Sequence, residues 1–320
     1  MIPMNTAPEQ HRQVPELNLI DYLAGTALEK QRFVDDFYQG LVEYGFIVLN
    51  PHEFDFDLVD ASYQAFKSFF KLPLATKQKY NIHDGGKRGY VPRLQEHAKN
   101  STNPDLKEFW HVGRELPPGH PLAQEYPDNQ WPEEIKDFQQ HTYALYEQLD
   151  QTAQVMFQSL ATALDVPKDY FTKLTADGNS ILRAIHYPPM GEFELPGSVR
   201  AAAHEDINLI TLLVGATDSG LELLDRDGQW LAVDSTPGQI VIDSGDMLSR
   251  ITNEVIPATT HRVVNPSDDT SDRYSMPFFC HPHPNAVLSC IDSCLQGGAK
   301  YPDITARDFL NQRLKEIGLS

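Results

Sequence analysis

The sequence predicts a mostly β fold with flanking helices. After Pro167, short apolar stretches recur at close intervals and are separated by turn signals such as DRDGQ and STPGQ. Before that point, the longer segments carry their apolar residues at helical spacing. Many short strands with frequent turns are typical of a sandwich or barrel. We therefore expect one β core with helices packed on its flanks.

The first half of the chain predicts three helices and two short strands. The stretch 83–120 is rich in Gly, His and charge, which indicates loop with short strands. The longest helix is expected at 133–164, where a helical period persists. The remaining elements expected here are a short strand over 14–23 that runs into a turn, a helix at 27–45 ending at Gly45, a strand at 46–50, and a helix at 55–70.

The second half predicts a series of strands and one final helix. The strands are expected at 180–187, 207–214, 221–224, 230–233, 239–242, 260–264, 274–280 and 286–291, and the helix at 305–317. No repeat, low-complexity segment or linker divides the chain. We expect a single domain over 1–320, comprising an N-terminal region (about 12–118), a long helix (about 133–164), a β core (about 178–291) and a C-terminal helix (about 305–317).

Charge and cysteine content exclude several classes of protein. The 320 residues include 26 Lys and Arg against 45 Asp and Glu, a net charge of −19, which disfavours nucleic acid or an anionic membrane as a partner. Three cysteines predict buried thiols in a reducing compartment rather than a disulfide framework. No apolar run reaches the roughly 18 to 20 residues of a membrane helix, and the N-terminal segment lacks a signal core. We expect a cytoplasmic protein with a small-molecule partner and leave its oligomeric state open.

The stretch AAAHEDINLITLL contains the first candidate metal ligands. His204 and Asp206 precede an apolar run that predicts a buried strand. Unpaired charged groups are costly in such a place, so both side chains need a partner. In a strand, residues two apart share a face, and an imidazole beside a carboxylate can hold a divalent metal. By itself H-x-D is weak evidence, because a hydrogen-bonded core histidine explains most instances.

Further along, His261 and the pair Arg273 and Ser275 complete a constellation. His261 begins another strand-like stretch, and two histidines with one carboxylate form the ligand set of non-haem Fe(II) oxygenases. In RYSMPFF, Arg273 and Ser275 share one strand face. A guanidinium binds a carboxylate in bidentate fashion and a nearby hydroxyl adds a donor, so the pair suits the far carboxylate of a dicarboxylic co-substrate.

This order of motifs resembles the 2-oxoglutarate/Fe(II)-dependent dioxygenase superfamily, in the isopenicillin N synthase-like branch. HEDINLITLL is similar to that branch's metal-strand segment, and VIDSGDMLSRITNEVIPATTHRV to its signature before the second histidine. YGFIVLN and FFKLPLATKQKY resemble its N-terminal region, and YPDITARDFLNQRL its C-terminal helix. The resemblance covers nearly the whole chain.

The resemblance implies a double-stranded β-helix (jelly-roll) core with iron inside one open end. His204, Asp206 and His261 would be the metal ligands, and Arg273, Ser275 and Tyr187 would bind 2-oxoglutarate. Phe279, on the same strand face as Arg273 if the strand alternates, could line the substrate pocket. Two departures, Ile185 where many relatives have Asn and Glu254 where many have Gly, weaken any transfer of substrate identity.

The implied activity is a dioxygenase that uses Fe(II), 2-oxoglutarate and O2 to oxidise a small organic substrate by hydroxylation, desaturation or cyclisation. Two alternatives remain open from the sequence. One is an isopenicillin N synthase-like Fe(II) oxidase that does not use 2-oxoglutarate, because such an enzyme keeps an R-x-S pair for its substrate. The other is a catalytically silent jelly-roll binding module.

Four further residues or motifs have a structural explanation beside a functional one. Arg88 and Arg93 flank GYVP, where relatives contact substrate, although surface charge is the simpler explanation. The motif His281-Pro282-His283 lacks a nearby acidic partner and predicts a turn at a strand end. Trp110 is expected to pack in the core.

Overall fold

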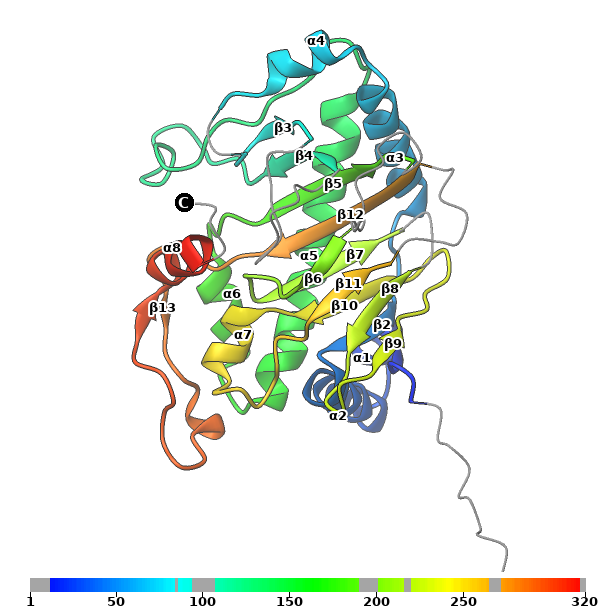
Figure 1. Ribbon diagram of the computed structural model, residues 1–320. Coiled ribbons are helices and arrows are strands. Elements are labelled where there is room, and N and C mark those ends of the chain that lie inside the picture. Colours follow the sequence, from blue (N-terminus) through cyan, green and yellow to red (C-terminus); the bar gives the residue numbers. More distant parts are fainter. Residues whose placement is uncertain are drawn as a thin grey trace, which may run out of the picture.

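The computed structural model describes residues 12–83, 86–93, 107–189, 201–215, 220–264 and 272–316. Figure 1 shows helices packed behind a large sheet, with a smaller sheet in front of it. The strands are β1 Glu16–Asn18, β2 Phe46–Asn50, β3 Gly89–Val91, β4 Glu108–Gly113, β5 Ile181–Tyr187, β6 Ala201–His204, β7 Ile210–Val214, β8 Leu221–Leu224, β9 Trp230–Ala232, β10 Ile240–Ser244, β11 His261–Val263, β12 Arg273–Cys280, β13 Val287–Leu288 and β14 Ile304–Thr305. The helices are α1 Leu19–Leu23, α2 Ala27–Tyr44, α3 Phe56–Phe70, α4 Leu74–Lys77, α5 Phe138–Ala163, α6 Tyr170–Thr175, α7 Asp246–Ile251 and α8 Ala306–Glu316, with two short 3-10 turns at Gln78–Tyr80 and Asp292–Cys294.

The large sheet combines strands from both halves of the chain. Its order is β1-β2-β10-β7-β12-β5-β4-β3, and all its pairings are antiparallel except that of β1 with β2. The N-terminal strands therefore form both edges, with β2 on β10 and β4 on β5. The expected β core with flanking helices is confirmed, while the division into regions stays a prediction.

A second sheet, β6-β11-β8-β9, faces the first and encloses an inner layer of side chains. One inner cluster joins Phe46 and Val241 of the large sheet to Leu223 of the small one. Another joins Tyr187 to Val263. Because each cluster draws on both sheets, the space between the sheets is the interior of the β core.

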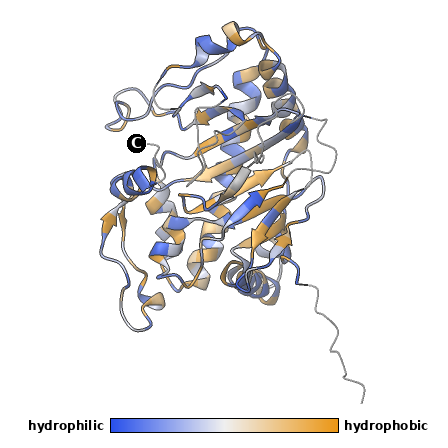
Figure 2. Cartoon of the chain, viewed as in Figure 1, coloured by the Kyte–Doolittle hydropathy of each residue, from blue (hydrophilic) through white to orange (hydrophobic). Residues whose placement is uncertain are grey.

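Strand β12 separates the inner layer from the helices by simple alternation. Tyr274, Met276, Phe278 and Cys280 belong to the main core, together with residues of α3 and α5. Arg273, Ser275 and Phe279 are left on the opposite, inner face. Figure 2 shows the strands of the large sheet mostly in hydrophobic colours and α8 mostly in hydrophilic ones. The sheet is thus covered on both faces, while α8 lies at the surface.

Helix α2 has well-defined signals at both ends. Thr26 and Glu29 form a capping box at its start, and Gly45 ends it in the left-handed conformation at φ 68°. A Cβ at Gly45 would lie 2.1 Å from Oγ1 of Thr259, so only glycine satisfies both the conformation and the space. This turn brings β2 directly into the sheet.

Several local predictions differ from the structure. The turn expected after the first strand is helix α1, which packs Tyr22 against Phe33 with 5.4 Å between ring centroids. The long helix begins at Phe138 rather than 133, because Asp137 adopts a left-handed conformation at φ 57°. Helices α6 and α7 are not among the predicted elements, since each is six residues long and too short to show a period. Among the helices described, none is both long and apolar enough to cross a membrane.

Candidate metal centre and co-substrate site

The metal-ligand candidates lie where the chain crosses from the small sheet to the large one. Strand β6 ends at His204, residues 205–209 form no strand, and β7 begins at Ile210. The expectation that His204 and Asp206 share one strand face is therefore wrong. Asp206 lies in the crossing segment, where its backbone carbonyl accepts a hydrogen bond from the amide of Asp246 at 2.8 Å. The crossing, rather than strand alternation, directs the carboxylate.

The three side chains nevertheless converge. His204 Nε2 lies 3.7 Å from Oδ1 of Asp206, and His261 Nε2 lies 3.9 Å from the same atom. The two imidazole centroids are 4.4 Å apart, because His261 and His204 face each other across the pairing of β11 with β6. One ligand atom from each residue lies within 4.8 Å of the others. Two imidazoles and a carboxylate at this separation can share one divalent ion.

Neighbouring groups fix the orientation of these ligands. The Thr211 hydroxyl on β7 donates a hydrogen bond to Asp206. His261 Nδ1 lies 3.1 Å from the carbonyl oxygen of Thr259, which leaves Nε2 turned toward the carboxylate. The ring of Phe46 meets the His261 ring edge-on at 5.6 Å. Such partners orient metal ligands and are part of a working site.

Two buried titratable groups, Asp243 and His281, lie near Asp206. Asp243 on β10 is fully buried beside the site, and burial, followed by the charge of Asp206, raises its pKa well above the usual range. His281 follows the end of β12, and burial lowers its pKa to about 4 although Asp206 acts in the opposite direction. The turn expected at His281 is consistent with the end of β12 at Cys280. The charge of Asp206 and burial thus disfavour a second negative charge at Asp243, which leaves Asp206 as the carboxylate available to a cation.

Arg273, Ser275 and Tyr187 come together at the other end of the inner face. Arg273 pairs in register with Tyr187, and its Cζ lies 5.3 Å from the centroid of the tyrosine ring. The arginine is 1% exposed. Within the described residues, its Nε and Nη1 have no hydrogen-bond partner. A buried guanidinium with unpartnered N–H groups is suited to an anion that arrives with a ligand.

Phe279 lies on the inner face of β12, at the end of the strand near the metal-ligand candidates. It pairs in register with Thr211, the residue that contacts Asp206. The guanidinium of Arg183 on β5 lies 5.4 Å from the Phe279 ring and 4.2 Å from that of Phe109. Arg183 Nε donates to Nε2 of His111 at 2.6 Å, and burial with the adjacent Arg183 charge lowers the pKa of His111 well below its usual value. Sequence reasoning missed Thr211 and Arg183, since each carries no motif of its own.

Arg88 and Arg93, which were expected to be surface charges, both contact other groups of the protein. Arg88 is 1% exposed, donates to Oδ1 of Asn179 at 2.7 Å and lies against Gly113, where a Cβ would come within 1.9 Å of its Cζ. Surface charge is therefore wrong for Arg88. Arg93 forms an ion pair with the buried Glu108 at 3.5 Å. Their part in a substrate pocket stays a prediction.

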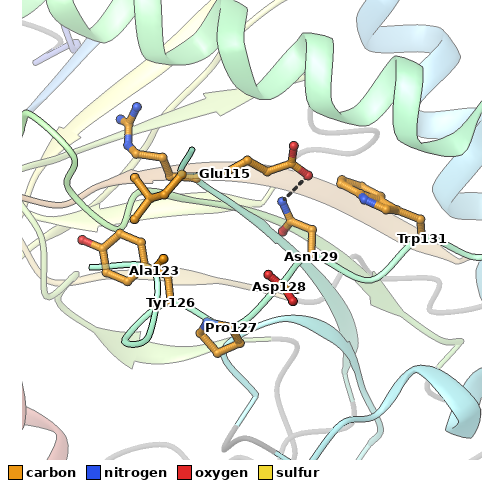
Figure 3. Close-up of a pocket in the computed structure, with 9 residues that line it drawn as sticks. Glu115, Ala123, Tyr126, Pro127, Asp128, Asn129 and Trp131 are labelled. Atoms are coloured by element: carbon orange, nitrogen blue, oxygen red, sulfur yellow. Dashed lines mark hydrogen bonds between the residues drawn. The ribbon is translucent and has the colours of Figure 1, made fainter. Parts of the chain in front are cut away.

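A cavity of about 320 Å³ opens elsewhere on the molecule (Figure 3). Arg114, Glu115, Tyr126 and Asn129 line it, and none of the metal-ligand candidates does. Its polar groups are already engaged, since Arg114 pairs with Asp150 at 3.0 Å and Asn129 donates to Glu115 at 3.3 Å. We therefore assign no ligand to it.

Comparison with known proteins agrees with this geometry. Residues 178–282 match the 2OG-Fe(II) oxygenase superfamily, and residues 17–134 match the family described as non-haem dioxygenase in morphine synthesis N-terminal. The 2-oxoglutarate-Fe(II) type oxidoreductase hxnY of Emericella nidulans is 31% identical, with 94% of this chain and 89% of that protein covered. A crystal structure of a 2OG-Fe(II) oxygenase family protein from Caulobacter crescentus is 44% identical with a TM-score of 0.85, covering 94% of this chain and 98% of that one. A full-length Neurospora crassa protein, solved in complex with alpha-KG and thymine, is 28% identical with a TM-score of 0.84 over 97% of this chain and 98% of its own.

The two facing sheets and the converging ligand set define a jelly-roll metalloenzyme of the non-haem iron class. The chain belongs to the 2OG-Fe(II) oxygenase superfamily, in its isopenicillin N synthase-like branch. It is a 2-oxoglutarate- and Fe(II)-dependent oxygenase that acts on small molecules. The expected fold, class of enzyme and cofactors are thereby confirmed, and the oxidase and silent-module alternatives are not favoured.

Proposed function

We propose that His204, Asp206 and His261 hold the Fe(II) of this oxygenase. The observation that carries the assignment is the convergence of their ligand atoms within 4.8 Å. The set also fits the metal chemically, because two imidazoles and one carboxylate occupy one face of an octahedron and leave three positions open. Iron bound there with 2-oxoglutarate and O2 supplies an oxidant for a substrate C–H bond, with succinate and CO2 as the co-products.

Arg273, Ser275 and Tyr187 are proposed to bind the distal carboxylate of 2-oxoglutarate. The unpartnered Nε and Nη1 of the buried Arg273 support this assignment. Ser275 lies two residues along the same strand face and offers a hydroxyl donor. The protein's part is to orient the co-substrate toward the metal and to keep water away from it.

Phe279, Arg183 and Phe109 are proposed to form the wall against which the substrate lies. The guanidinium lies over both rings, which gives an aromatic surface with a cationic component. This surface suits a small planar molecule with polar edges, and the Neurospora crassa structure with thymine makes nucleobases the first compounds to screen. Succinate formation reports turnover in such a screen whatever the oxidised product is.

We also propose a cytoplasmic location and no nucleic-acid partner. All three cysteines are free, as expected in a reducing compartment. The net charge of −19 opposes binding to a polyanion.

Alanine substitution of the three ligands tests the metal assignment. We expect His204→Ala, Asp206→Ala and His261→Ala each to abolish stoichiometric Fe(II) binding in anaerobic titration. Cooperative unfolding should persist, since these side chains contribute little to the apolar core. Ser159→Ala, in a helix remote from the site, serves as the folded control. Full Fe(II) affinity in the His261→Ala protein would show the assignment to be wrong and would redirect attention to His281.

A further inference from the structure

A buried group of charges lies on the helix-facing side of the large sheet. Glu108 on β4 is 1% exposed, and its carboxylate accepts from Lys77 Nζ at 2.6 Å and from the Tyr90 hydroxyl at 2.6 Å. His186 Nδ1 lies 2.9 Å from the same carboxylate. No local motif indicates these pairs, because the partners are 18 to 78 positions apart.

His186 extends this group to the beginning of β12. Its second ring nitrogen, Nε2, lies 2.7 Å from Oδ1 of Asp272. The ring is stacked on Tyr274 with 4.8 Å between centroids and an angle of 12° between planes. One imidazole thus bridges a carboxylate on β4 and a carboxylate on the residue that precedes β12, and it has little freedom to rotate.

The bridge lies directly beside the proposed 2-oxoglutarate residues. Tyr187 follows His186 on β5, Arg273 follows Asp272, and Tyr187 pairs with Arg273 in register. Since side chains alternate along a strand, His186 points toward the helices while Tyr187 points into the core. The two carboxylate contacts therefore hold the backbone from which Arg273 and Tyr187 project.

We propose that His186, through Glu108 and Asp272, is a positioning residue for the site that binds the distal carboxylate of 2-oxoglutarate. This inference rests on the proposed assignment of Arg273, Ser275 and Tyr187. The bridge fixes the ends of β4, β5 and β12 relative to one another. Small misplacements of a bidentate arginine are costly, because both hydrogen bonds depend on its angle.

The test compares two 2-oxo acids on the same Fe(II)-loaded protein. Both 2-oxoglutarate and 2-oxovalerate can chelate iron, but only the first has a distal carboxylate. Their binding is followed anaerobically by the metal-to-ligand charge-transfer band of the chelate. For His186→Gln we expect the dissociation constant for 2-oxoglutarate to rise by about tenfold or more, with the constants for 2-oxovalerate and Fe(II) unchanged. A merely structural role would weaken both acids alike.

Two further variants complete the design. Asp272 has a half-exposed side chain, so Asp272→Asn should fold even if His186→Gln does not, and it should show the same selective loss. Asp150→Asn removes the remote ion pair with Arg114 and is the control for general destabilisation. Equal weakening of both acids, or no change in either, in the Asp272→Asn protein overturns the inference. If wild-type protein binds both acids equally, the proposed carboxylate site itself fails, and this inference fails with it.

Discussion

Arg273 carries a full charge where water hardly reaches. Its side chain is 1% exposed, and two of its nitrogens have no partner among the described residues. A buried charge is costly unless it is paired, so this arrangement supports the proposed role of Arg273 in binding an anion. The cation–π contact with Tyr187 at 5.3 Å offsets part of that cost in the protein without a bound anion.

Replacing Arg273 should therefore weaken the co-substrate selectively. We expect Arg273→Ala to cost about 3 to 5 kcal/mol in 2-oxoglutarate binding, a loss on the order of a hundred- to a few thousand-fold in affinity. Arg273→Lys should recover only part, because an ammonium cannot form the bidentate contact. Anaerobic titration of the Fe(II) protein with 2-oxoglutarate measures both variants. Unchanged affinity in Arg273→Ala would contradict the assignment.

At the scale of elements, the buried Glu108 of strand β4 makes the stability of the fold depend on pH. Burial alone would raise the pKa of Glu108, but hydrogen bonds from His186, Lys77 and Tyr90 hold it near 2, against a reference value of 4.5. A carboxyl group whose pKa is lower in the folded state binds fewer protons than in the unfolded chain. Its contribution is therefore complete above the unfolded pKa and is lost as pH falls from about 4.5 toward 2.

The unfolding free energy measured at acidic pH tests this contribution of Glu108. The pKa difference corresponds to about 3 kcal/mol of unfolding free energy at neutral pH. We expect urea unfolding of the wild type to lose this amount between about pH 5 and pH 2, beyond the loss shown by Glu108→Gln. The variant should start less stable at pH 7 and approach the wild type in acid. Parallel profiles for the two proteins would contradict the expectation.

The elements that the sequence predicted well are those with strong local signals. The helix at 27–45 was expected because Phe33 and Phe37 recur at helical spacing and Gly45 ends the pattern, and α2 spans Ala27–Tyr44. The strand expected at 207–214 begins only at Ile210, because Leu209 is buried in a crossing segment rather than in a strand. Burial alone does not distinguish the two.

At the scale of the whole molecule, the N-terminal region is structurally tied to the core. Strands β2 and β4 pair with β10 and β5, and helices α3 and α5 pack on the outer face of the sheet. Removal of residues before β5 would leave two strand edges unpaired and expose Met276 and Phe278 to water.

A core fragment should therefore not fold by itself. We expect a chain of residues 178–320 to lack a cooperative urea transition and a fixed near-ultraviolet circular dichroism signal, while the full chain shows both. The loss of apolar burial is far larger than a domain's net stability. A cooperatively unfolding fragment would mean that the jelly roll is an independent domain and that the single-domain prediction is wrong.

The sequence by itself determined the class of fold, the enzyme family and the candidate ligands, because each depends on local pattern: helical period, turn residues, and the motifs around His204, His261 and Arg273. The tertiary structure decided how those motifs meet. Asp206 reaches the two imidazoles from a crossing segment, with Thr211 as its hydrogen-bond donor. Arg88 is buried against Gly113, and His186 bridges Glu108 and Asp272. Such contacts join positions far apart in the chain. They depend on sheet register and on burial, and the local spacing of residues predicts neither of these two properties.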